Sequence, residues 1–442
     1  MPAYIPPEIR GKKLKETVEL DCRHSADQSI EMVFYVKTLA DVVKVAPRIA
    51  MDETTGAWIG KGKPTEVFER AVAQVYRVER YGKNEGIIYI RSPLYNVDLK
   101  SDPLYQLLML AVGGPVLEWA YYTDVAFLDF TLPPKMLKKF PGPQFGIEGV
   151  RKLIGLEKGR PVIGTIVKPC AGLTVKEVAR KCYEAALGGA TFIKDDEKMM
   201  SPAYCPFEDK IKAVAEALAK ARAKTGLRCL YAPQIVARAD RLLERSARAV
   251  ELGADALMFN AVLAHTPEAL SILASSREVR VPLYAHSGGR SALSTGPRRI
   301  DDAVIVKLIR LSGGDFFQHG VYGVKQVHVA SEDETLLANL ARVMQEPLGT
   351  LRDTIPVTAG GLGAANLGLN LSRHKHPRLG YAVAALAGTN VLNHPDGPAA
   401  GATAMNQAAR TYFDAGVTEA KALADYARKN GLNELSAILG GK

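Results

Sequence analysis

Short apolar, β-prone segments alternate with amphipathic segments over the last two thirds of the chain. The apolar segments lie at 164–169, 191–197, 228–235, 256–262, 281–286, 316–320, 355–361 and 382–389. They follow one another at intervals of about 25 to 40 residues, the length of one strand–helix unit. Between them, stretches such as 175–187, 207–225 and 238–252 carry apolar residues at spacings of three and four, which is typical of helices. Eight such units predict a (β/α)₈ TIM barrel.

A doubly wound open sheet is the alternative architecture for alternating strands and helices. Its dinucleotide-binding form has a G-x-G-x-x-G motif after the first strand, and this chain has none there. Polar residues instead gather at the C-terminal ends of the predicted strands, where barrel enzymes have their active sites. They are Lys168, Lys194, Asp196, Glu197, His286, Gln318, His319, Gly360 and Gly361. This clustering favours both a barrel and an enzyme.

Residues 1–140 have a different pattern. Strand-like segments at 29–35 and 86–90 are mixed with a helix-like segment at 64–76, which predicts a separate α+β domain of ferredoxin-like type. A segment rich in glycine and proline follows at 140–149 and marks the entry into the barrel.

The barrel domain is expected at 141–400 and a C-terminal helical extension at 401–442. Two helical stretches, 400–415 and 417–430, form most of this extension. We expect these helices to pack on the barrel.

The composition is that of a globular protein, since 47% of the 442 residues are hydrophobic and 24% are charged. The chain has no run of about 18 apolar residues and no signal-peptide core, so we expect a cytoplasmic protein without membrane association. Five scattered cysteines without C-x-x-C spacing argue against a disulfide framework or structural zinc. The net charge of +10 is dispersed, without an RNA-binding signature, so we expect a small-molecule substrate rather than nucleic acid.

The segment GGATFIKDDE at 188–197 carries the most specific candidate chemistry. Side chains alternate along a strand, so Lys194 and Asp196 share a face, and Glu197 follows where the strand ends. Two converging carboxylates suit a hard divalent cation such as Mg²⁺. An ammonium group repels a metal, so Lys194 could be a ligand only after its charge is removed, for example by carbamylation with CO₂. From these residues alone, a surface cluster of charges is an equal alternative.

Several motifs resemble those of the large subunit of RuBisCO, and more closely those of the form IV RuBisCO-like proteins, which do not fix carbon. They are TTGAW at 54–58, FPGPQFGIEG at 140–149, GTIVKP at 164–169, GGATFIKDDE at 188–197, LSGGD at 311–315 and HPDGPAAGA at 394–402. The resemblance therefore covers nearly the whole chain. Its most specific part is the combination of the first-strand lysine with K-D-D-E.

The resemblance implies that Mg²⁺ binds to a carbamate on Lys194 together with Asp196 and Glu197. It implies that Lys168 takes part in proton transfer and that His286 lies near the substrate. Residues at or near substrate-binding positions are Trp58, Arg290, Gln318, His319, Gly360, Gly361 and Gly388. Because the position of Trp58 reaches a neighbouring subunit's site in RuBisCO, a homodimer with shared active sites is expected.

The chain departs from RuBisCO at several catalytic positions. Cys170 replaces the second lysine of K-P-K, Ser287 replaces a phosphate-binding arginine, and Gln318 replaces a histidine. The lysine of the mobile loop has no clear counterpart, since Lys325 stands at a different spacing. These losses are expected to abolish carboxylation of ribulose 1,5-bisphosphate.

The resemblance therefore implies a Mg²⁺ enzyme that acts through an enediolate on a keto acid-sugar or its monophosphate, as a decarboxylase, transcarboxylase or isomerase. A methionine-salvage enzyme of the 2,3-diketo-5-methylthiopentyl-1-phosphate enolase type is an alternative. That enolase lacks the first-strand lysine and uses lysines of its N-terminal domain, whereas this chain has Lys168 and carries Gly114 at one of those positions. A non-catalytic RuBisCO-like protein is a further alternative.

Overall fold

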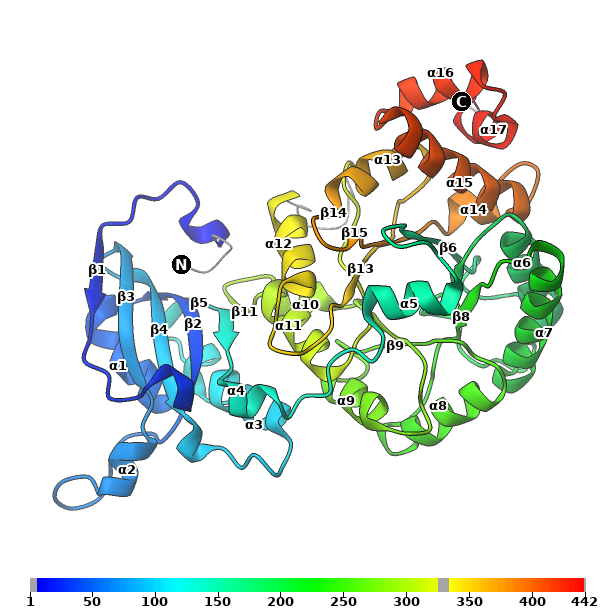
Figure 1. The fold of residues 1–442 in the computed structure, drawn as a ribbon. Helices are drawn as coiled ribbons and strands as arrows, with labels where there is room; N and C mark the ends of the chain where they lie inside the picture. The colour runs from blue at the N-terminus through cyan, green and yellow to red at the C-terminus, as the bar shows by residue number, and fades with distance from the viewer. Residues whose placement is uncertain (1–5, 325–333, 441–442) are drawn as a thin grey trace. The chain divides into compact units, whose positions relative to one another are not determined.

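The computed structural model describes residues 6–324 and 334–440 (Figure 1). The chain divides into two compact units: Met1–Phe140 with Gly289–Leu308, and Pro141–Gly288 with Ile309–Lys442. We call them unit 1 and unit 2. Within the described ranges, no helix combines the length and apolarity needed to cross a membrane.

Unit 2 is built around eight parallel strands. These are β6 (Val162–Ile166), β7 (Phe192–Lys194), β8 (Leu230–Ala232), β9 (Leu257–Asn260), β10 (Leu283–His286), β12 (Phe316–Gln318), β13 (Ile355–Thr358) and β16 (Ala384–Leu386). They pair in the order β8-β7-β6-β16-β13-β12-β10-β9. A parallel bridge between Gln234, two residues after β8, and Met258 of β9 closes the sheet. Each predicted apolar segment overlaps one of these strands, so the predicted barrel is confirmed.

Helices follow the strands around the barrel (Figure 1). They are α6 (Val175–Leu187), α7 (Phe207–Thr225), α8 (Leu242–Glu251), α9 (Pro267–Ser275), α12 (Glu334–Gln345), α13 (Ala364–Arg373) and α15 (Pro398–Ala415). One further helix, α11 (Asp302–Ser312), begins in unit 1 and ends in unit 2. Local chemistry defines where α6 begins. The Thr174 hydroxyl accepts a hydrogen bond from the backbone of Glu177, while the Glu177 carboxylate accepts one from the backbone of Thr174. The predicted helices at 175–187 and 207–225 coincide with α6 and α7.

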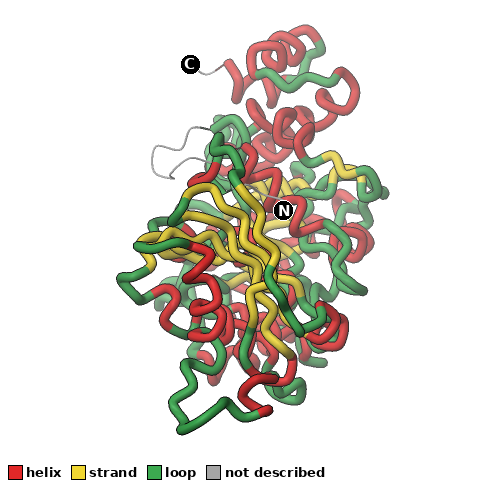
Figure 2. The backbone as a smooth tube through the Cα atoms, turned by 90° about the vertical axis from the view of Figure 1, so that its left-hand side faces the viewer, coloured by secondary structure: helices red, strands yellow, loops and turns green. Residues whose placement is uncertain are grey.

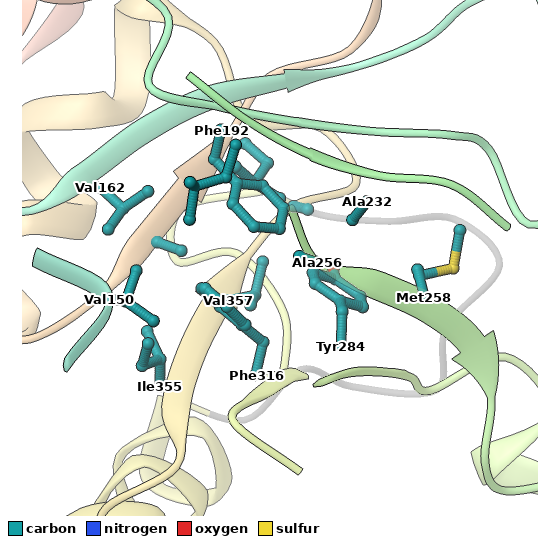
Figure 3. Close-up of a cluster of buried hydrophobic side chains, with 14 of the residues drawn as sticks. Val150, Val162, Phe192, Ala232, Ala256, Met258, Tyr284, Phe316, Ile355 and Val357 are labelled. Carbon is teal, nitrogen blue, oxygen red and sulfur yellow. The ribbon is translucent and has the colours of Figure 1, made fainter. Parts of the chain in front are cut away.

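Alternate residues of the strands fill the barrel interior (Figure 3). Phe192, Tyr284 and Phe316 meet at its centre, with ring centroids 4.8 to 6.2 Å apart. Gly164 on β6 lets β7 approach closely, because a Cβ at this position would lie 2.0 Å from the carbonyl oxygen of Phe192. The interior is therefore packed, and chemistry is restricted to the ends of the barrel.

One end of the barrel is covered by α5 (Gly146–Ile154), whose Ile147, Val150 and Ile154 join the core. The fully buried carboxylate of Asp315 fixes this helix to the strands. Its Oδ1 accepts hydrogen bonds from the backbone nitrogens of Phe145 (2.7 Å) and Gly146 (2.9 Å), and its Oδ2 accepts one from Leu283 (3.0 Å). An acid at a helix N-terminus also interacts favourably with the helix dipole.

Replacing Asp315 with alanine is expected to destabilise the protein by about 4 kcal/mol, because three buried N–H donors lose their acceptor. Asp315→Asn keeps an oxygen for two of these donors and should cost about half as much. The matched control is Asp353→Ala, since Asp353 accepts one bond at this helix end, from the backbone nitrogen of Ile147 (2.9 Å). The midpoint of thermal unfolding should be highest for the wild-type protein, lower for Asp315→Asn and lowest for Asp315→Ala. Equal midpoints for the two Asp315 variants would contradict this account.

Unit 1 contains a six-stranded mixed sheet, whose strands lie side by side in Figure 2. The strands pair in the order β1 (Glu16–Glu19), β3 (Gln74–Gly82), β4 (Glu85–Pro93), β2 (Ser29–Thr38), β5 (Tyr122–Thr131) and β11 (Arg298–Ile300). Only β11 pairs parallel to its neighbour. The helices of this unit are α1 (Val42–Asp52), α2 (Glu66–Ala71), α3 (Pro103–Val112), α4 (Pro134–Leu137) and α10 (Arg290–Ser294). The predicted α+β domain is confirmed.

Three features differ from the sequence-based expectation. The stretch 64–76 is helical only in α2, and its last residues begin β3. Residues 289–308, expected within the barrel domain, group with unit 1 because β11 extends the sheet of that unit. The C-terminal extension has one more helix than expected.

The elements after β13 complete unit 2. They are β14 (Lys375–His376), β15 (Gly380–Tyr381), α14 (Thr389–Leu392), α16 (Ala420–Lys429) and the additional helix α17 (Asn433–Gly440). Figure 1 shows α14, α15, α16 and α17 together at one side of the barrel. The Gln407 side chain of α15 holds α17 by donating to Glu434 Oε2 (2.6 Å) and accepting from the backbone nitrogen of Leu435 (2.9 Å).

Candidate active site

A cavity of about 790 Å³ is lined by residues at or just after the C-terminal ends of the barrel strands. Its lining includes Lys168, Lys194, Asp196, Glu197, His286, Gln318, Gly360, Gly361 and Gly388. All nine are among the candidates predicted from sequence. They come from the ends of six different strands, which is how barrel enzymes assemble their sites.

Lys194 ends β7 and is fully buried. Its Nζ donates one hydrogen bond to the carbonyl oxygen of Asp195 (3.0 Å) and lies 5.4 Å from the ring centroid of Tyr284. Burial lowers the pKa of Lys194 to about 8, although the carboxylates of Glu197 and Asp196 oppose this shift. This lysine is therefore easier to neutralise than an exposed one.

Asp196 follows β7 and is almost fully buried. Its Oδ2 forms an ion pair with Lys168 Nζ, and its Oδ1 accepts a hydrogen bond from the backbone nitrogen of Lys198 (2.9 Å). Burial raises the pKa of Asp196, but hydrogen bonds from Lys168, Lys198 and Cys170 outweigh it and leave the pKa below its ordinary value. The carboxylate is therefore ionised and available as an oxygen ligand.

Lys168 lies two residues after β6, and its side chain is 30% exposed. Besides Asp196, its Nζ contacts Cys170 Sγ at 3.2 Å. Burial lowers the pKa of Lys168, but the contacts with Asp196 and Cys170 together raise it above its ordinary value. The ion pair with Asp196 favours the charged amine and contributes to outweighing the effect of burial.

His286 ends β10 and faces Glu197, with 3.3 Å between His286 Nε2 and Glu197 Oε2. Its Nδ1 accepts a hydrogen bond from the backbone nitrogen of Gly288 (3.0 Å). Burial, followed by the charge of Lys194, lowers the pKa of His286 to about 4. The neutral ring, with Nδ1 as acceptor, carries its proton on Nε2 and directs it to Glu197.

Asp195, the middle acid of K-D-D-E, has a different role. Its buried carboxylate forms an ion pair with Lys210 and accepts hydrogen bonds from the Tyr231 hydroxyl (2.7 Å) and the backbone nitrogen of Gln234 (3.0 Å). The alternation of the strand turns this side chain away from Lys194 and Asp196. Asp195 therefore holds the segment in place while its two neighbours face the cavity.

The donor set fits a hard cation. The carboxylates of Asp196 and Glu197 and the buried Lys194 all line the cavity, and oxygen donors are what Mg²⁺ prefers. In the described part of the chain, no group of three or more His, Cys, Asp or Glu side chains could hold a metal. A third protein ligand would therefore have to come from a modified Lys194.

The rest of the cavity lining is neutral in the ranges that the structure describes. It includes Asn366, Thr389, Asn390, Asn393 and, from α17, Ile438. The Asn366 and Asn390 Oδ1 atoms accept hydrogen bonds from the backbone nitrogens of Gly363 (2.9 Å) and Ala364 (3.0 Å), where α13 begins. The five residues offer amide, hydroxyl and apolar contacts to a substrate.

His319 was predicted as a substrate contact, but it is buried beside the cavity rather than among the described residues that line it. Its Nδ1 forms a hydrogen bond with the carbonyl oxygen of Val357 (3.0 Å), and its Nε2 forms one with Nε2 of His374 (2.9 Å). Its ring therefore packs against β13 and the end of α13. The neighbouring Gln318 faces the cavity instead, and its Oε1 accepts a hydrogen bond from the Tyr284 hydroxyl (3.3 Å).

Two other candidates belong to unit 1. Arg290 Nε pairs with Asp302 Oδ1 at 3.0 Å, so this arginine already has a carboxylate partner within its unit. Trp58 donates a hydrogen bond to the carbonyl oxygen of Gly62 (3.2 Å) and packs edge-on against Phe68. Lys325 lies outside the described residues.

Sequence reasoning did not assign Cys170, Ile438 or the lining residues Asn366, Thr389, Asn390 and Asn393 to the site. Cys170 stood out in the sequence only as a departure from RuBisCO, but it contacts the amine of Lys168. Ile438 was missed together with α17, although the apolar residues Leu435, Ile438 and Leu439 are spaced by three and four and indicate an amphipathic turn of helix.

The chain matches known proteins over most of its length. The sequence pattern of the family described as "Ribulose bisphosphate carboxylase large chain, catalytic domain" matches residues 146–438. A ribulose bisphosphate carboxylase of Methanocaldococcus jannaschii is 29% identical over 86% of this chain and 90% of its own. A 3-oxo-isoapionate-4-phosphate decarboxylase of Rhizobium rhizogenes is 30% identical over 90% of this chain and 96% of its own.

Solved structures agree with these matches. The octameric RuBisCO of Pyrococcus horikoshii superimposes with a TM-score of 0.83 at 27% identity, over 94% of each chain. A RuBisCO-like protein (MtnW) of Alicyclobacillus acidocaldarius gives a TM-score of 0.81 at 25% identity, over 94% of this chain and 100% of that one. The chain therefore belongs to the RuBisCO large-chain family and is most like its RuBisCO-like, form IV members.

Proposed function

We propose that this protein is a Mg²⁺-dependent enzyme that removes CO₂ from a keto acid-sugar, or from its monophosphate, through an enediolate. The observation that carries the proposal is the convergence of Lys168, Lys194, Asp196, Glu197 and His286 on one cavity. An isomerase or a transcarboxylase would begin with the same charge development next to a ketone. Decarboxylation is the form that we favour.

Asp196 and Glu197 would hold the metal, together with a carbamate formed on Lys194 by CO₂. Support comes from the burial of Lys194 and its lowered pKa, since CO₂ reacts with the neutral amine. When bound, Mg²⁺ would act as a Lewis acid that stabilises negative charge as it develops on adjacent substrate oxygens. The carbamate would turn a repelling ammonium group into an anionic oxygen donor.

Lys168 would supply the proton. Loss of CO₂ from a β-keto acid breaks a C–C bond and leaves its electron pair on the substrate, which then takes a proton at carbon. Lys168 lies at the cavity, where its ammonium group can donate a proton to the substrate. The neutral His286, with its proton on Nε2, would orient Glu197 and donate hydrogen bonds rather than act as the acid.

The substrate class is supported by one relative and by the cavity. The name of the Rhizobium relative describes decarboxylation of a 3-oxo acid phosphate. The neutral lining, with Asn366, Asn390 and Asn393, suits hydroxyl groups, and Gly360 and Gly361 are retained beside it. A polyhydroxylated acid with one phosphate or none therefore fits this cavity better than a bisphosphate.

The test is a screen of 3-oxo sugar acids, with and without a terminal phosphate, for release of CO₂ in the presence of Mg²⁺ and bicarbonate. Solvent deuterium exchange at the carbon next to the ketone, measured by NMR, detects proton transfer even when CO₂ is not lost. Release of CO₂ from one of these acids would support the decarboxylase. Exchange without CO₂ release would favour an isomerase, and neither signal on any acid would contradict the proposal.

An enolase of the methionine-salvage type is the second candidate, since the MtnW structure is similar over 94% of this chain. The retained Lys168 argues against it. In unit 1, a Cβ at Gly114 would lie 2.8 Å from the carboxylate oxygens of Glu53, so a lysine there would require Glu53 to move. Enolisation of a 2,3-diketo-5-methylthiopentyl 1-phosphate would favour this candidate. A non-catalytic role would require that no substrate reacts.

We expect no measurable carboxylation of ribulose 1,5-bisphosphate. Cys170 and Gln318 stand where RuBisCO has a lysine and a histidine, and both lie at the site. Labelled CO₂ should not enter phosphoglycerate above the background of a protein-free control, with an authentic RuBisCO as positive control. Incorporation above that background would show that these positions had been misinterpreted.

Assembly and location follow from the same resemblance. We propose a homodimer with shared active sites, to which Trp58 of unit 1 would contribute, in the cytoplasm. The similar structure of the octameric RuBisCO from Pyrococcus horikoshii supports an oligomer. Exposed apolar side chains of unit 1, such as Ile59 and Val67, are also typical of a surface that a partner covers.

A further inference from the structure

Cys170 lies in the loop after β6, two residues beyond Lys168, and is half-buried. Its Sγ is 3.2 Å from Lys168 Nζ. Among the described residues, the Lys168 amine hydrogen-bonds with two side chains, Cys170 and Asp196. The amine is therefore held from two sides, by the carboxylate of Asp196 and by the sulfur of Cys170.

The proposed metal would compete for one of these two contacts. Lys168 Nζ pairs with Oδ2 of Asp196, the carboxylate that would bind Mg²⁺. A divalent cation attracts this carboxylate more strongly than an ammonium group does, and the two cations repel each other. Metal binding would therefore weaken the ion pair and leave Cys170 as the remaining side-chain contact of Lys168.

The thiol of Cys170 is chemically suited to hold the amine of Lys168 next to a metal site. Mg²⁺ prefers hard oxygen ligands, so the soft sulfur of Cys170 does not join the metal. Sulfur accepts a hydrogen bond weakly and without charge, so it can hold the amine while Asp196 is occupied by the metal. A lysine at this position would instead place a second positive charge beside Lys168.

We propose that Cys170 is a positioning residue that keeps the Lys168 amine at the cavity when the metal occupies Asp196. This inference rests on the proposed Mg²⁺ site. Cys170 would not touch the reacting atoms of the substrate and would act through Lys168. Its contribution would appear only in the metal-bound protein.

The test measures how readily Lys168 reacts with acetic anhydride, by mass spectrometry of its peptide. The exposed Lys176 of α6 serves as internal standard. Without Mg²⁺, wild type and Cys170→Ala should show equal acetylation of Lys168, because Asp196 holds the amine in both. With Mg²⁺ and bicarbonate, acetylation should rise at least fivefold in Cys170→Ala and less than twofold in wild type. Cys170→Ser should restore most of the protection, because a hydroxyl also accepts a hydrogen bond.

The matched control is Cys22→Ala, which removes the other half-buried cysteine and lies in unit 1. It should leave acetylation of Lys168 unchanged. Once a substrate is known, Cys170→Ala should lower kcat about tenfold with KM within twofold, since a displaced amine impairs a step after binding. Far-ultraviolet circular dichroism and the thermal midpoint show whether each variant is folded.

Two outcomes would overturn the inference, and they are distinguishable. If calorimetry shows Mg²⁺ binding but Cys170→Ala leaves the acetylation of Lys168 at the wild-type level, the role of Cys170 is wrong and the metal site stands. If the wild-type protein binds no Mg²⁺ with bicarbonate, the proposed metal site fails, and the role of Cys170 fails with it.

Discussion

Lys168→Ala is expected to lower CO₂ release from a keto acid-sugar about a thousandfold, the usual scale for losing a positioned proton donor. In the structure the amine of Lys168 faces the cavity beside Asp196. Without it, the carbon that is proposed to lose CO₂ would have no protonated amine next to it. Release of CO₂ and solvent deuterium exchange at carbon measure the two halves of the reaction. Both signals should fall over many turnovers, because the enediolate has to be protonated before the product can leave and the next substrate can bind.

Two control variants separate the effect of the positive charge of Lys168 from its role as a proton donor. Lys168→Arg keeps a cation beside Asp196 but holds its proton too tightly to donate it, so this variant should be about as inactive as Lys168→Ala. Lys176→Ala removes an exposed lysine of α6 and should retain wild-type activity. Full activity of Lys168→Ala on a true substrate would mean that Lys168 only supports the carboxylate of Asp196.

Lys194→Ala is expected to weaken Mg²⁺ binding in bicarbonate at least about a hundredfold, or about 2.8 kcal/mol. The third protein ligand would be lost, leaving the carboxylates of Asp196 and Glu197. In the wild-type protein, bicarbonate should strengthen Mg²⁺ binding, and in the variant it should have no effect. Isothermal titration calorimetry with and without bicarbonate measures both differences.

Lys194→Arg is the informative companion variant. It keeps a positive charge at the end of β7 but cannot form the carbamate, so it should bind Mg²⁺ as poorly as Lys194→Ala or more poorly. The carbamate proposal would be excluded if either variant bound Mg²⁺ as tightly as the wild-type protein does. It would also be excluded if bicarbonate did not change the affinity of the wild-type protein for Mg²⁺.

Much of the barrel was predictable because its strands are short, apolar and regularly spaced. Fully buried parallel strands have few alternatives once their spacing matches a strand–helix unit. Elements that depend on distant partners were harder to predict. The strand β11 exists because Arg298, Arg299 and Ile300 pair with β5, more than 150 positions earlier in the chain. No local pattern at 298–300 announces such a pairing.

Among the predicted site residues, some have side-chain orientations that local sequence determines, and others have orientations that depend on distant residues. Alternation along one strand is local, so the shared orientation of Lys194 and Asp196 could be read from sequence. The orientation of His319 could not, because it depends on His374, which lies 55 residues away in the chain, directly after α13. The contact between Cys170 and Lys168 was also out of reach, since a spacing of two residues in a loop fixes no direction.

The burial of Asp195 changes how the K-D-D-E motif should be used to compare relatives. Its carboxylate is held by Lys210 and Tyr231, so selection on this position follows the integrity of the barrel. A relative that has lost Lys194 or Glu197, and all activity with them, would still be expected to keep this acid together with its lysine and tyrosine. Matches at position 195 therefore trace common descent, whereas a claim of shared chemistry requires matches at 168, 194, 196 and 197.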